Sequence, residues 1–258
     1  MLFGLYTKYR QKTQILSING IFIFWRKRGK IKKNELQMRC KMYELDKNIF
    51  AMHMALFFED GTEVPILKVA LRLQEEFKIV FPQEPDIVPL PSDAPKEIPR
   101  CTFKNDRNAT LSLSLNRIDF NGGFKAGIDW KNQINIIFFN LFRICEQFDI
   151  KVVRIGVVVQ ALGDDDIICE LNTRVSIDGF AESEEKNVSF VMKKQVDEIL
   201  LNVITNIIYN KKNEDNSKVI SVDVNTDICN TLPSDGNEKM NIVQIIIDEI
   251  EGKLKNVF

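Results

Sequence analysis

Residues 152–171 read VVRIGVVVQALGDDDIICEL, and this stretch decides the fold. Its first ten residues are mostly apolar and rich in Val, which predicts a strand buried within a sheet. The carboxylates that follow are Asp164, Asp165, Asp166 and Glu170, which are either a divalent-metal site or part of a solvated turn. Neighbouring strand residues point to opposite faces, and the spacing lacks the alternate ligands of a calcium loop. We therefore favour the turn.

Arg154 interrupts the apolar run. A guanidinium in such a position either reaches solvent or pairs with an acid, and Asp223 and Asp227 are the candidate partners. A role in binding an anion or a carboxylate is the alternative.

The segments before this strand predict more sheet. Residues 48–61 (NIFAMHMALFFEDG) form a strand that ends in a turn, and residues 82–99 hold six of the eight prolines and form a long surface loop. Residues 111–120 (LSLSLNRIDF) alternate strictly, which predicts one strand with Leu on its buried face. On its polar face the same strand carries Ser112, Ser114 and Asn116.

Two helices are predicted from apolar residues at spacings of three, four and seven. The first stripe is Ile134, Ile137, Phe138, Leu141, Cys145 and Phe148, and the second is Val243, Ile246, Ile247, Ile250, Leu254 and Val257. One offset of 109 residues superposes the two stripes and also places residues 111–116 on residues 220–225 (ISVDVN). The same offset aligns Phe142 with Glu251, which is a mismatch. Residues 190–200 (FVMKKQVDEIL) fit a helix, whereas residues 201–210 (LNVITNIIYN) fit a strand.

These elements predict an α+β fold, with an antiparallel sheet built from two pseudo-repeated strands-then-helix units and two long helices on one face. The units span about residues 42–150 and 151–258 of a single domain, 42–258, which follows a basic arm, residues 1–41. The other sheet face is then either solvated or a recognition surface. Its expected residues are Ser112, Ser114, Asn116, Arg154, Ser221, Asp223 and Asn225.

The order of features resembles a sporadically distributed, functionally uncharacterised family of prokaryotic proteins. The resemblance covers about residues 80–258 and rests on VVRIGVVVQ (152–160), VISVDVNTDI (219–228) and a last helix that ends in Phe258. The family shares a central strand similar to R-I-G-L-R-Y-I-N and a strand similar to I-L-D-I-D. Val158, Val159 and Gln160 depart from it. The resemblance supports the fold and implies no catalytic residues.

Charge is distributed unevenly along the chain. Residues 1–41 hold eleven Lys or Arg and one acid, whereas the remaining residues hold 24 basic and 35 acidic side chains. A basic arm can bind nucleic acid, and the expected contacts are Arg26, Lys27, Arg28, Lys30, Lys32 and Lys33. The apolar residues 15–25 are too few to span a bilayer. They form an extra strand, leader residues, or a membrane or nucleic-acid anchor, and we favour the first two.

Common catalytic patterns are missing from the sequence. His53 is the only histidine, the five cysteines form no C-x-x-C pair, and neither a G-x-x-x-x-G-K-[ST] nor a strand-linked G-x-G-x-x-G motif occurs. Scattered, odd-numbered cysteines indicate a reducing compartment. We therefore expect a cytoplasmic protein without a cofactor or a transmembrane segment.

The sequence favours a non-enzymatic binding protein that contacts another protein, as an accessory factor in a toxin-, defence- or chaperone-like system. Nucleic-acid binding through the arm and a carboxylate-dependent metalloenzyme are the alternatives. A homodimer could form if the apolar strand at residues 152–161 lies at the sheet edge.

Overall fold

The computed structural model describes residues 15–18, 21–24, 48–91, 93–123, 129–163, 184–210 and 218–257. The chain divides into two compact units, Met1–Lys41 and Met42–Phe258. In the first unit, β1 (Ile15–Ile18) pairs antiparallel with β2 (Ile21–Phe24). The apolar stretch near the N-terminus thus contains a short hairpin.

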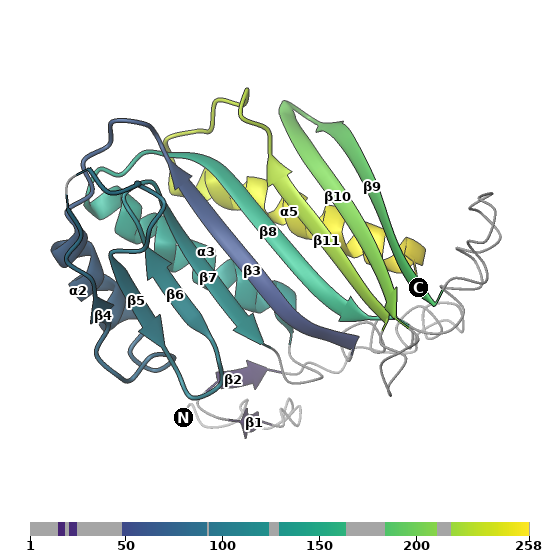
Figure 1. Cartoon of the computed structure of the whole chain (residues 1–258), viewed down its shortest axis with the longest axis horizontal. Coiled ribbons are helices and arrows are strands. Elements are labelled where there is room, and N and C mark those ends of the chain that lie inside the picture. The colour runs from purple at the N-terminus through teal and green to yellow at the C-terminus, as the bar shows by residue number, and fades with distance from the viewer. Residues whose placement is uncertain are drawn as a thin grey trace, which may run out of the picture. The chain divides into compact units, whose positions relative to one another are not determined.

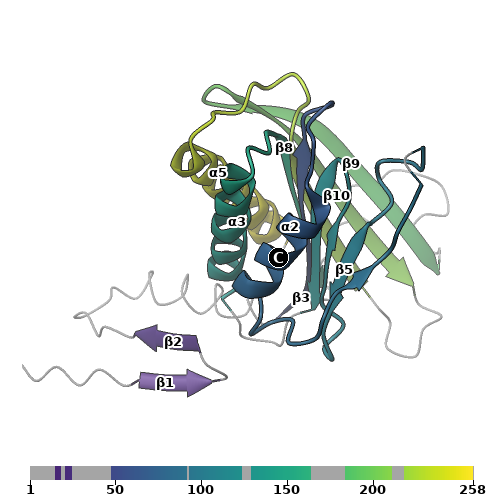
Figure 2. The ribbon, with the colours of Figure 1, turned by 90° about the vertical axis from the view of Figure 1, so that its left-hand side faces the viewer.

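The second unit is built on one antiparallel sheet in the order β4-β5-β6-β7-β3-β8-β11-β10-β9 (Figure 1). Its strands are β3 (Ile49–Phe58), β4 (Asp86–Ile87), β5 (Cys101–Lys104), β6 (Thr110–Leu113), β7 (Arg117–Gly123), β8 (Val152–Leu162), β9 (Glu185–Val196), β10 (Ile199–Asn210) and β11 (Lys218–Thr226). The helices are α2 (Ile66–Glu76), α3 (Trp130–Gln147) and α5 (Gly236–Val257). All three lie on the same side of the sheet (Figure 2).

The predicted α+β class is wrong, because the structure is mainly β, with nine strands in this sheet and three helices in its described part. The difference arises largely between residues 185 and 210, where a helix was an open alternative. Val196 pairs with Ile199 across a two-residue turn, and Asp197 takes a positive φ of 50° there. Asp tolerates this conformation, and such turns favour hairpins. β9 and β10 then pair along twelve residues each.

The predicted strand at residues 111–120 is two strands. Ser114 closes the turn between β6 and β7, because its N–H donates to the carbonyl of Arg117 (2.9 Å) and its Oγ donates to Asn116 Oδ1 (2.9 Å). Serine favours such local bonds over continuing a ladder. Apolar and polar residues continue to alternate through this turn, so the sequence pattern alone does not reveal it.

The predicted offset of 109 residues is therefore wrong for the strands, since it places β6 and this turn on β11. In the helices the same offset joins buried residues, since Ile137 and Ile246 are both buried, as are Cys145 and Leu254. The mismatch at Phe142 remains, because its side chain is buried whereas Glu251 forms ion pairs with Lys131 and Lys255.

The core lies between the sheet and the helices, and both predicted helices contribute their apolar stripes to it. Asp129 begins α3 by accepting a bond from the N–H of Asn132 (3.1 Å), and Asp235 accepts bonds from the N–H groups of Asn237 and Glu238 at the start of α5. These are ordinary N-caps. Strand residues Leu56 and Val157 are fully buried on the same side of the sheet.

β8 is a central strand, between β3 and β11, so the predicted pairing of residues 152–161 at a sheet edge is wrong. Where β11 ends, the Oγ1 of Thr226 accepts a bond from the N–H of Ile155 (3.0 Å). The hydroxyl thereby continues the ladder beyond the last paired residues.

Candidate recognition face

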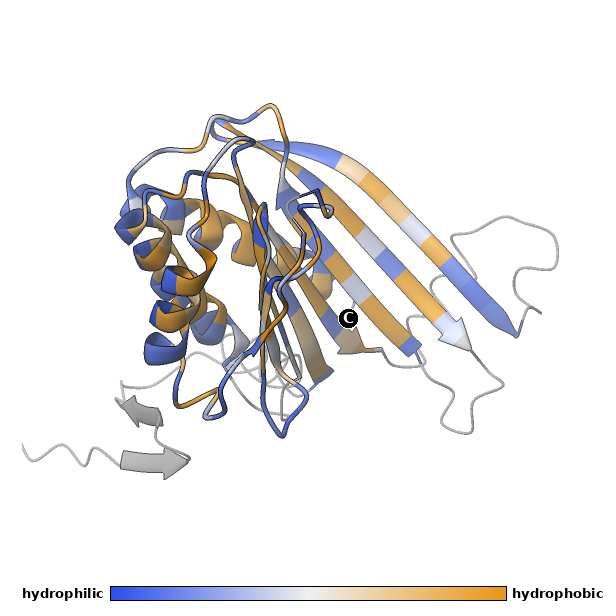
Figure 3. Cartoon of the chain, turned by 60° about the vertical axis from the view of Figure 1, so that its left-hand side comes forward, coloured by the Kyte–Doolittle hydropathy of each residue, from blue (hydrophilic) through white to orange (hydrophobic). Residues whose placement is uncertain are grey.

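Strand residues alternate between the helix side and the opposite side, which we call the helix-free face. Figure 3 shows the corresponding bands of hydrophobic and hydrophilic residues along the strands. The paired registers place on this face His53, Ala55, Phe57, Ser112, Arg117, Asp119, Asn121, Arg154, Gly156, Val158, Gln160, Val191, Lys193, Asn202, Ile204, Asn206, Ser221, Asp223 and Asn225. Most of these residues are polar, whereas the helix side of the same strands is mostly apolar.

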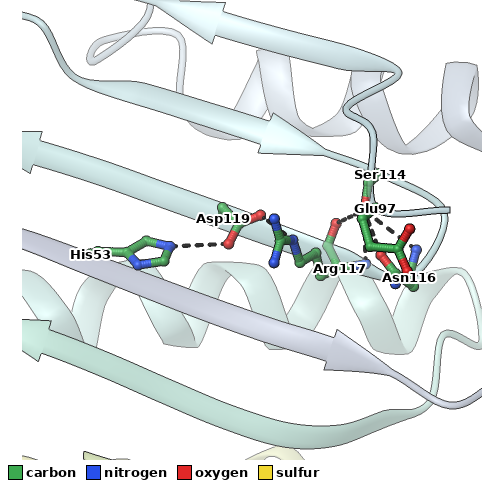
Figure 4. Close-up of polar contacts among 6 residues, drawn as sticks. All are labelled: His53, Glu97, Ser114, Asn116, Arg117 and Asp119. Carbon is green, nitrogen blue, oxygen red and sulfur yellow. Dashed lines mark hydrogen bonds and ion pairs between the residues drawn. The ribbon is translucent and has the colours of Figure 1, made fainter. Parts of the chain in front are cut away.

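A chain of three charged or polar groups crosses β3 and β7 on this face (Figure 4). His53 Nε2 lies 3.0 Å from Asp119 Oδ1, and Asp119 Oδ2 lies 2.8 Å from Arg117 Nε. The side chain of Asp119 is almost buried, while that of His53 is 40% exposed. The carboxylate therefore contacts both the imidazole ring and the guanidinium. The ring is still accessible to a partner molecule.

Phe57 lies near the end of β3, between two arginines. It is paired with Arg117 of β7 on one side and Arg154 of β8 on the other. The Arg154 guanidinium lies over the ring at 4.9 Å, a cation–π contact. Gly156 leaves room beside the ring, since a Cβ there would be 3.9 Å from Phe57 and 3.5 Å from the Cβ of Asn225.

Arg154 does not form the predicted ion pair with Asp223 or Asp227. Its Nη2 donates instead to Asn225 Oδ1 (2.7 Å), which also accepts a bond from Asn202 Nδ2 (3.3 Å). Asn225 Nδ2 in turn donates to Asp223 Oδ1 (3.1 Å). The amide of Asn225 therefore stands between the arginine and the acid, so they are connected without direct contact.

Asp227 forms a second cluster where β11 ends. Its carboxylate lies 2.8 Å from Lys193 Nζ and accepts a bond from the N–H of Cys229 (3.1 Å). Bonds from the Cys229 thiol and from Lys193 hold the pKa of Asp227 well below its ordinary value. The folded state thus gains stability from this ionised group above about pH 4, and loses it as the pH falls towards the lower folded pKa.

The same carboxylate raises the pKa of the exposed Cys229 thiol, chiefly by accepting its hydrogen bond. Replacing Asp227 with Asn should lower this pKa and speed alkylation of Cys229 by iodoacetamide at pH 8 about two- to five-fold, because more thiolate is present. Peptide mass spectrometry measures the rate at this residue alone. Asp223→Asn is the matched control and should leave the rate unchanged; equal rates in D227N and the parent would contradict the assignment.

The structure places Ser112, Arg154, Ser221, Asp223 and Asn225 on the helix-free face, as the sequence predicted. Ser114 and Asn116 lie instead in the turn after β6, where Asn116 Nδ2 donates to Glu97 Oε1 (3.4 Å).

The candidate metal residues Asp164, Asp165, Asp166 and Glu170, and the arm residues Arg26, Lys27, Arg28, Lys30, Lys32 and Lys33, lie outside the described residues.

Sequence reasoning missed several contributors to the face. Arg117 and Asp119 were hidden by the unrecognised turn, which shifts β7 out of the predicted register. His53 lies in the strand predicted at residues 48–61, but its contact with Asp119, a residue 66 positions away, has no local signal. Lys193 lies in the segment that fits a helix from its sequence, and Asn202 lies in a predicted strand to which no face could be assigned.

Within the described ranges, no group of three or more His, Cys, Asp or Glu side chains is arranged to hold a metal ion. In the same ranges no helix is long and apolar enough to cross a membrane. Neither a scan of protein-family models nor a search of curated proteins finds a match to this chain. The resemblance to the uncharacterised prokaryotic family therefore stays a prediction.

Proposed function

We propose that the protein is a non-enzymatic binding protein and that its helix-free face recognises another protein. The observation that carries the proposal is the pre-organised set of contacts around Phe57. Arg154, Asn225 and Asp119 are each fixed by a neighbour from another strand, so their orientations are set before a partner arrives. Binding then costs little side-chain entropy.

The charges on this face favour a protein over a nucleic acid. Arg117, Arg154 and Lys193 alternate with three acids, Asp119, Asp223 and Asp227, and the charged groups lie close to one another. Surfaces that bind nucleic acid are strongly positive. Protein interfaces instead combine arginine and aromatic anchors with a polar rim, which is the composition found around Phe57.

The His53–Asp119 pair also resembles the orienting half of a catalytic triad. Such a triad needs a nucleophile within hydrogen-bonding reach of the imidazole. Among the described residues, the hydrogen-bond partner of His53 is Asp119, and no hydrogen bond joins the ring to a Ser, Thr or Cys side chain. The pair therefore supports a role in positioning surface groups better than one in catalysis.

Site-specific photo-crosslinking in the native host tests the proposal. A benzophenone side chain at Ser112 or Ser221 lies on the helix-free face, whereas one at Lys68 or Asn241 lies on the exposed side of α2 or α5. We expect covalent products that contain a second protein species from the first two positions and not from the last two. Equal products from all four positions, or products containing this chain alone, would overturn the proposal.

Nucleic-acid binding by residues 1–41 is a second candidate, favoured only by the excess of basic side chains there. It requires an affinity that falls steeply with salt and disappears when these residues are removed. A fluorescent DNA or RNA oligonucleotide titrated at two salt concentrations measures both. An affinity that is the same at both would exclude this role.

A further inference from the structure

β9 forms one end of the nine-stranded sheet and pairs along its whole length with β10. No strand in the described ranges pairs with its other edge. Three consecutive apolar residues near its centre are exposed: Phe190 by 52%, Val191 by 71% and Met192 by 44%. A twelve-residue edge strand with exposed apolar side chains on both faces is a template for pairing with another strand.

Lysines on an edge strand usually prevent such pairing by projecting their charges into solvent. On β9 they are directed back to their own chain. Lys193 pairs with Asp227 at 2.8 Å, Lys194 pairs with Glu249 of α5, and Lys186 lies over the ring of Tyr209 at 5.2 Å. The Lys193 and Lys194 charges are thus partly offset by carboxylates of their own chain, which weakens the usual protection of the edge.

The sequence of β9 is complementary to itself in one antiparallel register. When the strand pairs with a second copy about Ser189, Glu185 lies opposite Lys193 of the second copy, and Val188 lies opposite Phe190. Glu184 then lies opposite Lys194 in the same way. Centring the pair on Phe190 instead would place Lys186 opposite Lys194, a repulsive contact. Opposite charges and apolar pairs across strands stabilise a sheet, and like charges destabilise it.

We infer that the protein forms a two-fold symmetric homodimer by antiparallel pairing of β9 with β9 of a second copy, centred on Ser189. Each outward N–H and C=O group at the centre then gains a partner. The two-fold axis runs perpendicular to the sheet, so both sets of helices lie on the same side. The two helix-free faces join into one surface. The dimer does not depend on the proposed function, because it is formed by the backbone edge of β9 and does not involve the contacts around Phe57.

Light scattering coupled to size-exclusion chromatography of the full chain tests the dimer with a charge swap. The parent should elute at twice its 29.8 kDa mass. Glu185→Lys places like charges opposite each other at two positions, and Lys193→Glu does the same, so each variant alone should dimerise at least about ten-fold more weakly. An equimolar mixture of the two restores both opposite-charge pairs and should recover the dimer mass.

Two controls separate this edge from a general loss of folding. Lys104→Glu reverses a charge on β5, far along the sheet order from β9, and should leave the dimer intact. Val191→Pro removes an N–H that points away from β10 and should give a monomer with an unchanged circular dichroism spectrum. A monomeric parent at about 100 µM, dimers of either single charge variant, or a mixture that stays monomeric would each overturn the inference.

Discussion

Replacing Trp130 with Ala should lower the free energy of unfolding by about 3–5 kcal/mol. Trp130 is the first residue of α3 and the largest fully buried side chain in the described core, with 1% of its surface exposed. Truncation removes a whole indole from between the helix and the sheet. The remaining side chains are held by strand pairing on one side and by the N-cap at Asp129 on the other, so the cavity cannot close easily.

Guanidinium denaturation followed by far-ultraviolet circular dichroism measures this loss. Trp130→Phe is the matched control, because it keeps an aromatic ring and should lose markedly less. The comparison separates packing volume from any effect on the helix start. A loss below about 1 kcal/mol for Trp130→Ala would mean that the site collapses or that Trp130 is not part of the core.

The helices were predictable because their signal is local. An apolar stripe at spacings of three and four fixes which side of a helix is buried, and the members Ile134 and Ile246 are fully buried as expected. The two Asp residues that begin α3 and α5 are equally local. The positions of both helices along the sequence could therefore be predicted without knowing the order of the strands.

The sheet was predictable only in part, because strand order and register are set by distant residues. The turn at Ser114 lies inside an unbroken alternating pattern, and only the pairing of β6 with β7 reveals it. The central place of β8 depends on β3 and β11, which are far away in sequence on either side. An apolar strand looks the same at a sheet centre and at an edge until its neighbours are known.

The candidate recognition face was likewise predictable where the signal is local, and not where it depends on contacts between distant strands. Alternation alone assigned Ser221, Asp223 and Asn225 to the polar face, since residues two apart in a strand share a face. The predicted partners of Arg154, Asp223 and Asp227, were wrong, because the guanidinium donates to Asn225. Asp227 instead pairs with Lys193 on β9. A contact among three strands cannot be derived from the pattern of one.

Substitution with Asn should lower the free energy of unfolding strongly at Val157 but only slightly at Val158, the next residue of β8. Val157 is fully buried on the helix side, between Met54 and Val224 of the adjacent strands. Val157→Asn loses the transfer free energy of a buried Val and leaves an amide among apolar groups, for a total loss of about 3–6 kcal/mol. Val158 lies on the helix-free face beside His53 and Asp223, where an amide finds polar neighbours.

Val158→Asn should therefore cost less than about 1 kcal/mol in the same denaturation measurement, which makes it the matched control for Val157→Asn. The pair also bears on function, because it tests which side of the sheet is free. If both variants were strongly destabilised, the face opposite the helices would be covered in solution, and the recognition surface proposed around Phe57 would be inaccessible. If only Val157→Asn is destabilised, that face is open, and variants at Phe57 or Arg154 can then weaken binding without weakening the fold.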